Sequence, residues 1–444
     1  MQRLRASYRS IPVGSPVRLA KRTSNLFRPR TATNRPGLDV SGLTGVLQVD
    51  PEARTADVAG MCTYVDLVDA TLPYGLTPLV VPQLKTITLG GAVSGLGIES
   101  ASFRNGLPHE SVLEMDILTG AGEILTARPD NAQADLFAGF PNSYGTLGYA
   151  TRLRIELEPV NTHVAVRHVR FEDLDELFAA VGQIMATRTW DGQDVDYLDG
   201  VMFSVAESYL TLGTKIRHPG PGSDYTGQQI YYRSIQRRRS DVLTTRDYLW
   251  RWDTDWFWCS GAFGVQNPVI RRLWPSRYRR SDVFWKLVAL DRRFDLSNRL
   301  EVRRGRPRRE AVIQDVEIPV ERTADFLRWF TEHVPIEPVW LCPLRLRGTR
   351  EWPLYPLEAG RDYVNVGFWS TVPITPGGSG SDTNRAIEHA VDALGGHKSL
   401  YSDSFYSRAD FDARYGAAHY LALKQRYDPD QRLLDLYEKA VRQR

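Results

Sequence analysis

The chain has 444 residues, of which 42% are hydrophobic and 25% are charged, a composition typical of a globular protein with more than one core. Its formal net charge of +3 gives no indication of a nucleic-acid partner. Three cysteines without C-x-x-C spacing exclude a zinc site or a disulfide framework and favour a reduced, cytoplasmic setting. No apolar run approaches the ~18 residues of a membrane span, and no signal-peptide pattern is expected.

The first residues are basic. Nine Lys or Arg and no acid precede Asp39. Arg-rich, acid-poor starts occur in organelle transit peptides. The stretch VRLAKRTSNLF (17–27) surrounds a short apolar pattern with bases and hydroxyl groups. That pattern favours the alternative interpretation, a segment that binds an anion.

From residue 44 onward, the pattern predicts short strands and helices. The predicted elements, in chain order, are a hairpin (44–60), a helix ending at Gly75 (61–75), a buried strand (76–83), a hairpin (111–127), a short helix (135–140) and an alternating strand (149–160). In the last strand, Ala150, Leu153, Ile155 and Leu157 are predicted to face the core. Many short strands without repeated βαβ units predict an α+β domain.

The composition changes after Pro159, and we place the boundary between domains 1–159 and 160–444 there. In the second domain we expect an antiparallel sheet flanked by helices. Its predicted strands lie in 201–216, 311–319 and 363–371, and its predicted helices in 171–188, 323–334 and 384–396. A final helix is predicted from Asp430, capped by Asp428 with Pro429 at its first position.

An aromatic and basic region spans residues 230–280. Its aromatic residues are Trp250, Trp252, Trp256, Phe257 and Trp258, and its arginines are Arg237–Arg239, Arg271, Arg272, Arg279 and Arg280. The aromatic rings would either fill the core of the second domain or form an entrance at a membrane surface for a lipid substrate. A nucleic-acid interface is not expected.

Two glycine-rich segments stand out, TLGGAVSGLGIESASFRNG (88–106) and PNSYGTLGYA (141–150). GLGIES resembles the dinucleotide motif G-x-G-x-x-G, but Ser100 replaces the last glycine and no βαβ context surrounds it, so we reject that interpretation. Two others remain open. The small residues would either pack closely or let backbone amides and hydroxyls hold a pyrophosphate or a flavin ring.

The first segment, followed by EMDILTGAGEIL and SYGTLGYATRLRIELEP, resembles the FAD-binding domain of the vanillyl-alcohol-oxidase (PCMH-type) superfamily. IQDVEIP (313–319), VWLCPLRL (339–346), LYSDSFYSRADFDARYG (400–416) and LKQRYDP (423–429) are similar to the Δ24-sterol reductase branch. The resemblance implies a two-subdomain FAD-binding domain over 1–159. It also implies a cap, or substrate, domain over 160–444, whose C-terminal segment packs back on the FAD domain.

The resemblance implies which residues contact FAD. They are Thr86, Thr88, Gly90, Gly91, Ser94, Gly97, Ile98, Ser100, Ser102, Gly106, Ser143, Gly145, Thr146, Gly148 and Lys424. The usual glycine-rich phosphate loop is replaced here, so Lys21, Arg22, Thr23, Ser24 and Asn25 are expected to bind the phosphates. Neither 17–27 nor 86–106 contains a His or Cys that could attach the flavin, which predicts non-covalent FAD.

FAD would carry the redox step, and the protein would orient the substrate and supply a proton. Glu99, expected in an apolar cleft at the ring end of the loop, is the first candidate acid, because burial would keep it protonated. The alternative for Glu99 is a turn or a pair with Arg104. Asp403, between Tyr401 and Tyr406, is the second candidate, with a surface turn as its alternative. Gln314 is expected on a strand that crosses the flavin, and Lys424 is either near the flavin or solvated.

The resulting prediction is an ene reductase that uses FAD and NADPH to saturate an isolated C=C bond in a lipid. The arginine-rich, lysine-poor composition is typical of GC-rich bacterial genomes. Bacterial members of the branch that the chain resembles include the reductase of tuberculostearic acid synthesis, so the resemblance implies, as the first substrate, the 10-methylene fatty acyl chain of a phospholipid, reduced to the 10-methyl form. A lipid methyltransferase would be its functional partner, with peripheral contact at the inner membrane face. The alternatives are a sterol or isoprenoid side-chain reductase, an oxidase or dehydrogenase of a polyprenyl-phosphate sugar, and a non-enzymatic flavin-binding accessory protein. No metal is expected.

Overall fold

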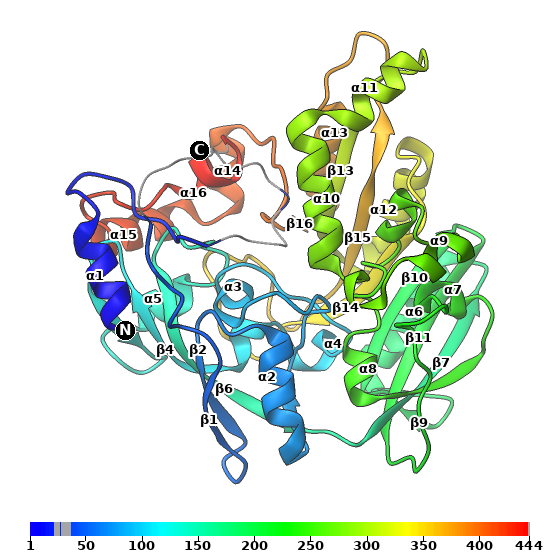
Figure 1. Ribbon diagram of the computed structural model, residues 1–444, viewed down its shortest axis with the longest axis horizontal. Coiled ribbons are helices and arrows are strands. Elements are labelled where there is room, and N and C mark those ends of the chain that lie inside the picture. The colour runs from blue at the N-terminus through cyan, green and yellow to red at the C-terminus, as the bar shows by residue number, and fades with distance from the viewer. Residues whose placement is uncertain (22–26, 28–36, 443–444) are drawn as a thin grey trace.

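The computed structural model describes residues 1–21, 27 and 37–442. It contains two β-sheets with helices around them, so the predicted α+β class is confirmed (Figure 1). A smaller sheet belongs to the N-terminal part of the chain and a larger antiparallel sheet to the part after Pro159. The C-terminal helices return to the smaller sheet (Figure 1).

The smaller sheet has the strand order β1-β2-β6-β4-β5, and β3 pairs with the far end of β6. Its strands are β1 (Val46–Asp50), β2 (Thr55–Ala59), β3 (Leu76–Pro78), β4 (Val112–Leu118), β5 (Ile124–Ala127) and β6 (Tyr149–Pro159). The helices of this part are α1 (Gln2–Ser10), α2 (Tyr64–Thr71), α3 (Leu89–Ser94), α4 (Ser102–Asn105) and α5 (Ala134–Gly139).

The central strand β6 shows why this sheet forms. Its side chains alternate between two faces, as strand geometry requires. The predicted core residues Ala150, Leu153, Ile155 and Leu157 are all buried, which confirms that prediction. Arg152 points to the other face and forms ion pairs with acids on the neighbouring strands β2 and β4. Both predicted hairpins are also present.

The larger sheet has the strand order β12-β7-β11-β10-β14-β15-β13-β16. Its strands are β7 (His163–Phe171), β10 (Tyr197–Ser204), β11 (Glu207–Ile216), β12 (Ser240–Thr244), β13 (Arg309–Pro319), β14 (Val339–Arg345), β15 (Asp362–Pro373) and β16 (His397–Lys398). Its helices are α6 (Leu174–Thr187), α12 (Val320–His333) and α13 (Asp382–Ala393), and a small hairpin joins β8 (Thr189–Trp190) to β9 (Gln193–Asp194). Residues 201–216 form two strands, β10 and β11, that meet in a hairpin.

The two faces of the larger sheet differ in chemistry. One face is apolar and packs against α6, α12 and α13, for example through Val316 against Phe326. The other face carries polar and indole side chains on the neighbouring strands β10, β14, β15 and β13. We call this the polar sheet face, and it consists of Asp199, Trp340, Asn365, Trp369, Asp315 and Glu317. The alternation of strand side chains therefore places several acids together on the side away from the helices.

The aromatic and basic region contains α7 (Tyr231–Ile235), α8 (Thr245–Leu249) and α9 (Pro268–Leu273), and the chain continues through α10 (Ser281–Phe294) and α11 (Leu296–Arg303). Trp250, Trp252, Trp256 and Phe257 are buried, so these rings fill the core, and the entrance interpretation is wrong for them. Two of the arginines are also buried. Arg271 pairs with Asp255, and Arg279 donates to backbone carbonyls.

The C-terminal segment contains α14 (Arg408–Arg414), α15 (Ala417–Tyr427) and α16 (Leu436–Ala440). The helix predicted from Asp430 is wrong. Asp428 instead accepts hydrogen bonds from the amides of Arg432 and Leu433, which bend the chain, and α16 starts later with Asp435 as its cap. The segment contacts the N-terminal part directly, since the Val17 amide donates to the Arg432 carbonyl at 2.7 Å.

Over the described residues, none of the helices combines the length and apolar character needed to cross a membrane. The same residues contain no group of three or more His, Cys, Asp or Glu arranged to hold a metal ion.

Candidate active site

The structure brings the two glycine-rich segments into contact. The amide of Tyr144 donates to the carbonyl of Ser94 at 2.7 Å. The Tyr144 ring covers Gly95, where an added Cβ would lie 3.1 Å from a ring carbon. The segments therefore form one continuous surface.

The second segment contains a strained turn at residues 142–145. Asn142 and Tyr144 have φ angles of 61° and 50°, in the left-handed region that residues other than glycine seldom adopt. Between them, Ser143 is fully buried, and its hydroxyl has no hydrogen-bond partner among the described residues. Strained backbone and an unsatisfied buried hydroxyl are both features that concentrate at ligand sites.

Lys21 lies at the edge of the first segment. Its ammonium donates to the Thr88 hydroxyl at 3.1 Å and is partly exposed. Gly91 is exposed beside it, and a Cβ there would lie only 2.9 Å from the Thr88 hydroxyl. A cation, a hydroxyl and bare backbone are therefore placed together where a phosphate group could be bound. Arg22, Thr23, Ser24 and Asn25 lie outside the described residues.

Several other predicted FAD contacts also serve to pack the protein. Gly97 lies between Pro82 and Pro108, where an added Cβ would lie 2.8 Å from a ring atom of each, and a Cβ added to Gly90 would lie 2.6 Å from the carbonyl oxygen of Gly60. Gly106 has φ +69° and lies against Glu110. The hydroxyl of Ser102 accepts from the Glu99 amide at 3.1 Å. The small-residue packing interpretation therefore accounts for much of this segment.

The remaining predicted FAD contacts are distributed along the two segments. Ile98, Ser100, Thr146, Gly145 and Gly148 are buried, whereas Thr86 and Ser94 are partly exposed. Gly145 and Gly148 both have positive φ angles, and a Cβ on Gly148 would lie 2.7 Å from the Leu118 carbonyl.

Glu99 belongs to a buried cluster of charges. Its Oε1 lies 2.9 Å from Nη2 of Arg251, and the same nitrogen lies 2.8 Å from Oδ2 of Asp199. All three side chains are buried. We call Glu99, Arg251 and Asp199 the acid cluster.

The two carboxylates of the acid cluster differ in their hydrogen bonds. Oδ2 of Asp199 accepts from the indoles of Trp252 at 3.1 Å and Trp340 at 3.2 Å, in addition to Arg251. Oε1 of Glu99 accepts from the Ser100 hydroxyl at 2.7 Å in addition to Arg251. The second oxygen of each carboxyl group, Oε2 of Glu99 and Oδ1 of Asp199, has no partner among the described residues. Asp199 thus accepts three side-chain hydrogen bonds and Glu99 two.

The pKa of Glu99 is raised above its usual value. Burial is the largest cause, the charge of Arg251 opposes it, and the neighbouring charge of Asp199 adds to it. One guanidinium faces two buried carboxyl groups, so keeping a proton on one of them avoids an unbalanced negative charge. Glu99 is the carboxyl group that is suited to hold this proton.

Sequence reasoning missed both partners of Glu99. The proposed pair with Arg104 is wrong, because Arg104 forms a bidentate ion pair with Glu158 at 2.8 Å. Arg251 is 152 residues away from Glu99 and lies in an aromatic run that gave no hint of its partner. The sequence offered one signal of this cluster, because Asp199 is the single acid within the apolar strand YLDGVMF.

A second buried polar group lies on β13 and β15. Asp315 accepts from the Asn365 amide at 2.9 Å and is hydrogen-bonded to Tyr401, whose hydroxyl also accepts from the Trp369 indole at 3.0 Å. Burial raises the pKa of Asp315 to about 6, while the hydrogen bonds from Asn365 and Tyr401 oppose the rise. Asp315 is thus another carboxyl group that titrates above its usual range.

Aromatic rings connect the two acidic groups. Phe257 stacks on Trp369 with ring centroids 4.3 Å apart. Its ring centroid also lies 5.3 Å from that of Trp340, whose indole donates to Asp199 of the acid cluster. Tyr144 of the strained turn lies near Tyr401, because its hydroxyl accepts from the Leu400 amide at 3.1 Å. The strained turn, the acid cluster and Asp315 therefore surround one part of the polar sheet face.

The other predicted catalytic residues lie elsewhere. Gln314 is on the apolar face of β13, where its amide donates to Asn384 of α13 at 2.7 Å, so the strand directs it away from Asp315. Asp403 is partly buried, and its carbonyl accepts from Lys398. Tyr406 is buried beside Tyr415.

Lys424 holds the C-terminal segment in place. Its ammonium lies 2.6 Å from Asp428 and donates to the carbonyls of Thr146 at 2.9 Å and Leu433 at 2.7 Å. Every proton of this ammonium is thereby accounted for. The interpretation as a solvated lysine is wrong. Lys424 instead links the C-terminal segment to Thr146, which follows the strained turn.

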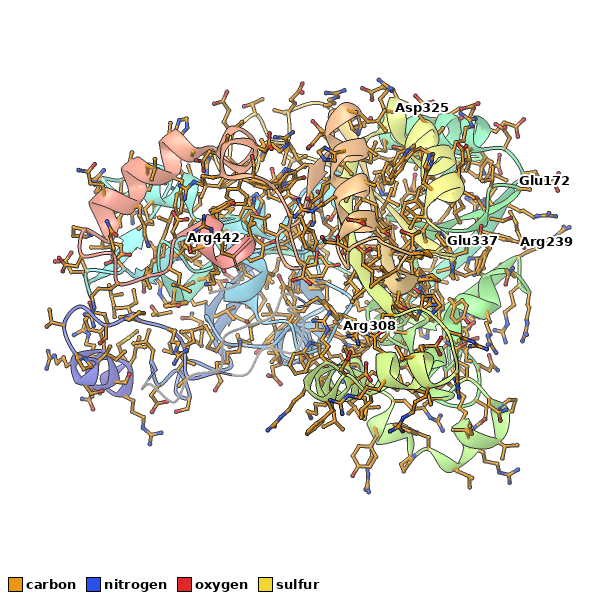
Figure 2. All side chains as sticks on the ribbon, turned by 90° about the horizontal axis from the view of Figure 1, so that it is seen from above. Glu172, Arg239, Arg308, Asp325, Glu337 and Arg442 are labelled. Carbon is orange, nitrogen blue, oxygen red and sulfur yellow. The ribbon has the colours of Figure 1, made fainter. Side chains whose placement is uncertain are left out.

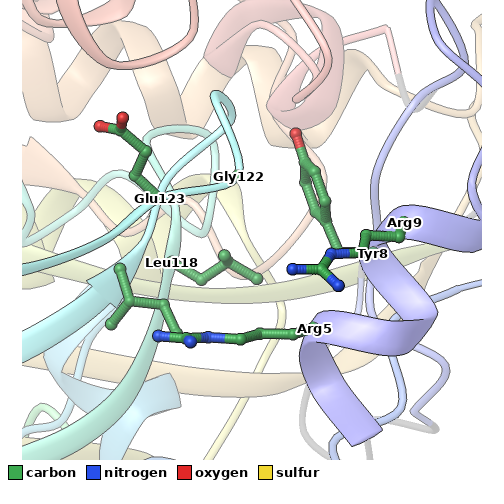
Figure 3. Close-up of a pocket in the computed structure, with 7 residues that line it drawn as sticks. Arg5, Tyr8, Arg9, Leu118, Gly122 and Glu123 are labelled. Atoms are coloured by element: carbon green, nitrogen blue, oxygen red, sulfur yellow. The ribbon is translucent and has the colours of Figure 1, made fainter. Parts of the chain in front are cut away.

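A separate shallow cavity lies between α1 and the turn that joins β4 to β5 (Figure 3). Arg5, Tyr8 and Arg9 line it from α1, and Leu118, Gly122, Glu123 and Ile124 from the hairpin. None of the predicted cofactor or catalytic residues contributes to it.

Comparison with known proteins gives a family match for the N-terminal part of the chain and similarities over more of its length. Residues 13–128 match the model of a family described as "FAD binding domain". The Delta(24)-sterol reductase of Arabidopsis thaliana is 26% identical over 344 residues, which cover 74% of this chain and 60% of that protein. The human Delta(24)-sterol reductase is 23% identical over 411 residues, which cover 89% of this chain and 76% of that protein. Cytokinin dehydrogenase 10 of Oryza sativa subsp. japonica is 31% identical over 154 residues, or 35% of this chain and 28% of that protein.

The family match identifies residues 13–128 as an FAD-binding domain, as the resemblance to the PCMH-type superfamily implied. Over most of its length the chain is similar to Δ24-sterol reductases.

The described residues fit this cofactor. Lys21 and Thr88 offer a cation and a hydroxyl for phosphate, and the buried Ser143 hydroxyl has an unused hydrogen-bonding capacity.

Proposed function

We propose that the protein is an ene reductase that uses FAD, held without a covalent bond, and NADPH to saturate an isolated C=C bond of a lipid. The observation that carries this proposal is the acid cluster. Glu99 is buried, has a raised pKa and retains one carboxyl oxygen without a partner among the described residues. These are the properties of a group that holds a proton near neutral pH for delivery to a substrate.

An isolated alkene has no carbonyl group that could stabilise added electrons. Saturation therefore requires a proton on one carbon and a hydride on the other. When bound, FAD supplies the hydride, having received it from NADPH. Glu99 supplies the proton from its carboxyl group, and the carboxylate that remains is stabilised by Arg251 and the Ser100 hydroxyl. In balance, NADPH, a proton and the alkene give NADP⁺ and the saturated lipid.

The protein's other residues have binding and positioning roles in this proposal. Lys21 and Thr88 would bind the phosphates, and Ser143 would donate to or accept from the cofactor. The ion pair with Asp199 would hold the Arg251 guanidinium in position beside Glu99. The aromatic rings of Phe257, Trp340 and Trp369 exclude water from the polar sheet face.

The proposed substrate is a 10-methylene fatty acyl chain carried by a phospholipid, which becomes the 10-methyl chain. Protonation of a 1,1-disubstituted methylene gives a tertiary cation, which suits an acid-first mechanism. A sterol or isoprenoid side-chain alkene meets the same chemical condition and is the second candidate. The names of the relatives in Arabidopsis thaliana and humans favour that second candidate.

The test is anaerobic mixing of the purified flavoprotein with NADPH, followed by each lipid in turn. Reduction of the flavin should bleach its absorbance, and the correct alkene should restore it, with mass spectrometry showing a gain of two hydrogens. A flavin that NADPH cannot reduce would indicate an accessory protein. A flavin reduced instead by a polyprenyl-phosphate sugar would indicate the alcohol dehydrogenase alternative. Bleaching that no alkene reverses would overturn the reductase proposal.

A further inference from the structure

Exposed apolar side chains are concentrated in one segment of the chain. Among the described residues, fifteen large hydrophobic side chains are exposed, and nine of them lie between residues 269 and 302. These nine are Val269, Ile270, Leu273, Tyr278, Leu290, Phe294, Leu296, Leu300 and Val302. We call the segment 268–308, which includes α9, α10 and α11, the helical arm. Such a concentration marks an interaction surface rather than scattered surface residues.

Each helix of the arm exposes an apolar pair at helical spacing. The pairs are Val269 and Leu273 on α9, Leu290 and Phe294 on α10, and Leu296 and Leu300 on α11. Residues four apart lie on the same side of a helix, so each pair forms a short apolar stripe. By contrast, α12 exposes Glu321, Arg322, Asp325 and Arg328, as a water-facing helix does.

The helical arm is strongly basic. It contains thirteen Lys or Arg and four Asp or Glu, whereas the rest of the chain has six more acids than bases. Arg272, Arg299 and Arg303 are exposed, and no ion pair of theirs occurs within the described parts of the chain. The positive charge is thus local, and it lies beside the apolar stripes.

The arm projects from the body of the molecule. In Figure 1, α10 runs beside the large sheet, and α11 follows above the upper end of α10. In Figure 2, the yellow-green helices of the arm lie at the lower edge of the molecule, whereas α12, with Asp325, lies at the upper edge. The apolar stripes are therefore on a side of the molecule that α12 does not cover.

The inner side of α10 leads to the candidate active site. Trp285 and Val288 pack on the core that contains the aromatic rings of that site. Arg292 donates to the Phe27 carbonyl at 2.5 Å, and the Phe27 amide donates to the carbonyl of Tyr401 at 3.0 Å. One helix therefore connects the exposed stripes with the residues beside Asp315.

We propose that the helical arm docks on the surface of a bilayer that contains anionic phospholipid. Apolar stripes between exposed arginines are typical of helices that lie in a membrane interface, where basic side chains meet phosphate groups. A second copy of this chain would bring like charges together, and a partner protein would need an acidic surface matched to these arginines, whereas an anionic bilayer offers a phosphate group to each of them. That the lipid substrate enters from this bilayer rests on the proposed function, whereas docking itself does not.

Vesicle co-sedimentation of the full-length flavoprotein tests this inference. We expect binding to vesicles of phosphatidylcholine with phosphatidylglycerol, weak binding to phosphatidylcholine alone, and loss of binding as salt screens the charges. Reversing two charges, in Arg299→Glu/Arg303→Glu, should weaken binding about tenfold or more. Leu290→Ser/Phe294→Ser should weaken binding to the anionic vesicles at low salt as well, because the apolar stripe is lost. Matched controls are Arg322→Glu on α12 and Leu421→Ser on α15, an exposed leucine outside the arm.

Two further measurements keep the outcomes distinct. Turnover with detergent-dispersed lipid should be unchanged in the arm variants, because they lie outside the site, and flavin absorbance should show that they are folded. Vesicle binding without any alkene reduction would defeat the proposed function and leave docking supported. Absence of binding to anionic vesicles, binding equally strong in the arm variants and controls, or self-association through the arm in place of vesicle binding would each overturn the docking inference.

Discussion

Nη2 of Arg251 lies 2.9 Å from Oε1 of Glu99, and the two side chains are buried together beneath Tyr248 and Trp252. This nitrogen is shared with Asp199 at 2.8 Å. One guanidinium therefore serves two carboxyl groups, of which Asp199 accepts three side-chain hydrogen bonds and Glu99 two. The predictions below follow from this sharing and from the polar sheet face around it.

The first prediction concerns the proton of Glu99. Glu99→Gln keeps the size of the side chain but removes the acid, so alkene reduction should fall about 10²–10⁴-fold. Reduction of the flavin by NADPH should change little, because that step does not use Glu99. Stopped-flow absorbance separates the two steps. Glu158→Gln is the matched control, since Glu158 is a paired glutamate that contacts Arg104 and Lys215. Equal alkene turnover in Glu99→Gln and the wild type would remove Glu99 from the mechanism.

The second prediction concerns Arg251. Arg251→Met leaves Glu99 and Asp199 buried without a cation, and breaking a buried pair in this way costs about 3–5 kcal/mol of unfolding free energy. Adding Glu99→Gln and Asp199→Asn removes both ionisable carboxyl groups and should recover part of the loss. Urea unfolding of the wild type, Arg251→Met, Glu99→Gln/Asp199→Asn and the triple variant measures this coupling. A triple variant no more stable than Arg251→Met would contradict the charge explanation.

The acid cluster also shows what the sequence could and could not predict. The α+β class, the two hairpins and the buried side of β6 follow from local alternation, and all are confirmed. Glu99 could be identified because it stands alone among small residues. Its partner could not, since the pairing of Glu99 with Arg251 depends on packing between segments 152 residues apart.

Local pattern also failed where two faces of one strand differ. Gln314 and Asp315 are neighbours in sequence, yet β13 directs one toward α13 and the other toward Tyr401. Which face meets the site is decided by the order of strands in the sheet. The C-terminal helix was misplaced for a similar reason, because Asp428 pairs with Lys424 and bonds two later amides instead of capping a helix.

The third prediction is a pH dependence of stability at Asp315. Its pKa is about 6 in the folded chain and near 3.8 when unfolded, so the folded chain keeps a proton that the unfolded chain releases between these values. Stability contributed by this group therefore falls as the pH rises from about 4 to about 6 and is constant above that. Asp315→Asn carries no such charge, and its stability relative to the wild type should rise by about 2 kcal/mol over the same interval.

Urea midpoints of Asp315→Asn and the wild type at pH values across this interval test the third prediction. Their difference cancels the titration of all other groups. Asp382→Asn is the control, because hydrogen bonds from Ser379 lower the pKa of that exposed carboxyl group, so the stability of this variant relative to the wild type should not rise with pH. A difference that does not vary between pH 4 and 6 would mean that Asp315 titrates normally.

The fourth prediction concerns the brace formed by Lys424. Lys424→Met leaves Asp428 buried without its cation and removes donors to Thr146 and Leu433, so the unfolding free energy should fall by about 3 kcal/mol. The absorbance spectrum of bound flavin should be unchanged in the folded protein, because the ammonium is occupied by protein groups. A shifted flavin spectrum with normal stability would instead support a direct contact with the flavin.

The last prediction concerns Ser143, whose buried hydroxyl lacks a partner among the described residues. If FAD satisfies this hydroxyl, Ser143→Ala should weaken FAD binding by the ~0.5–1.5 kcal/mol of one hydrogen bond, or about two- to tenfold. The FAD-free protein should be equally stable or slightly more stable, because an unsatisfied buried hydroxyl is removed. Fluorescence titration of the FAD-free protein and its thermal unfolding measure the two effects. Thr71→Ala is the control, because the Thr71 hydroxyl is buried but bonded to the Leu67 carbonyl at 3.0 Å. That variant should lose stability without losing FAD affinity, and the same pattern in Ser143→Ala would show that Ser143 serves packing alone.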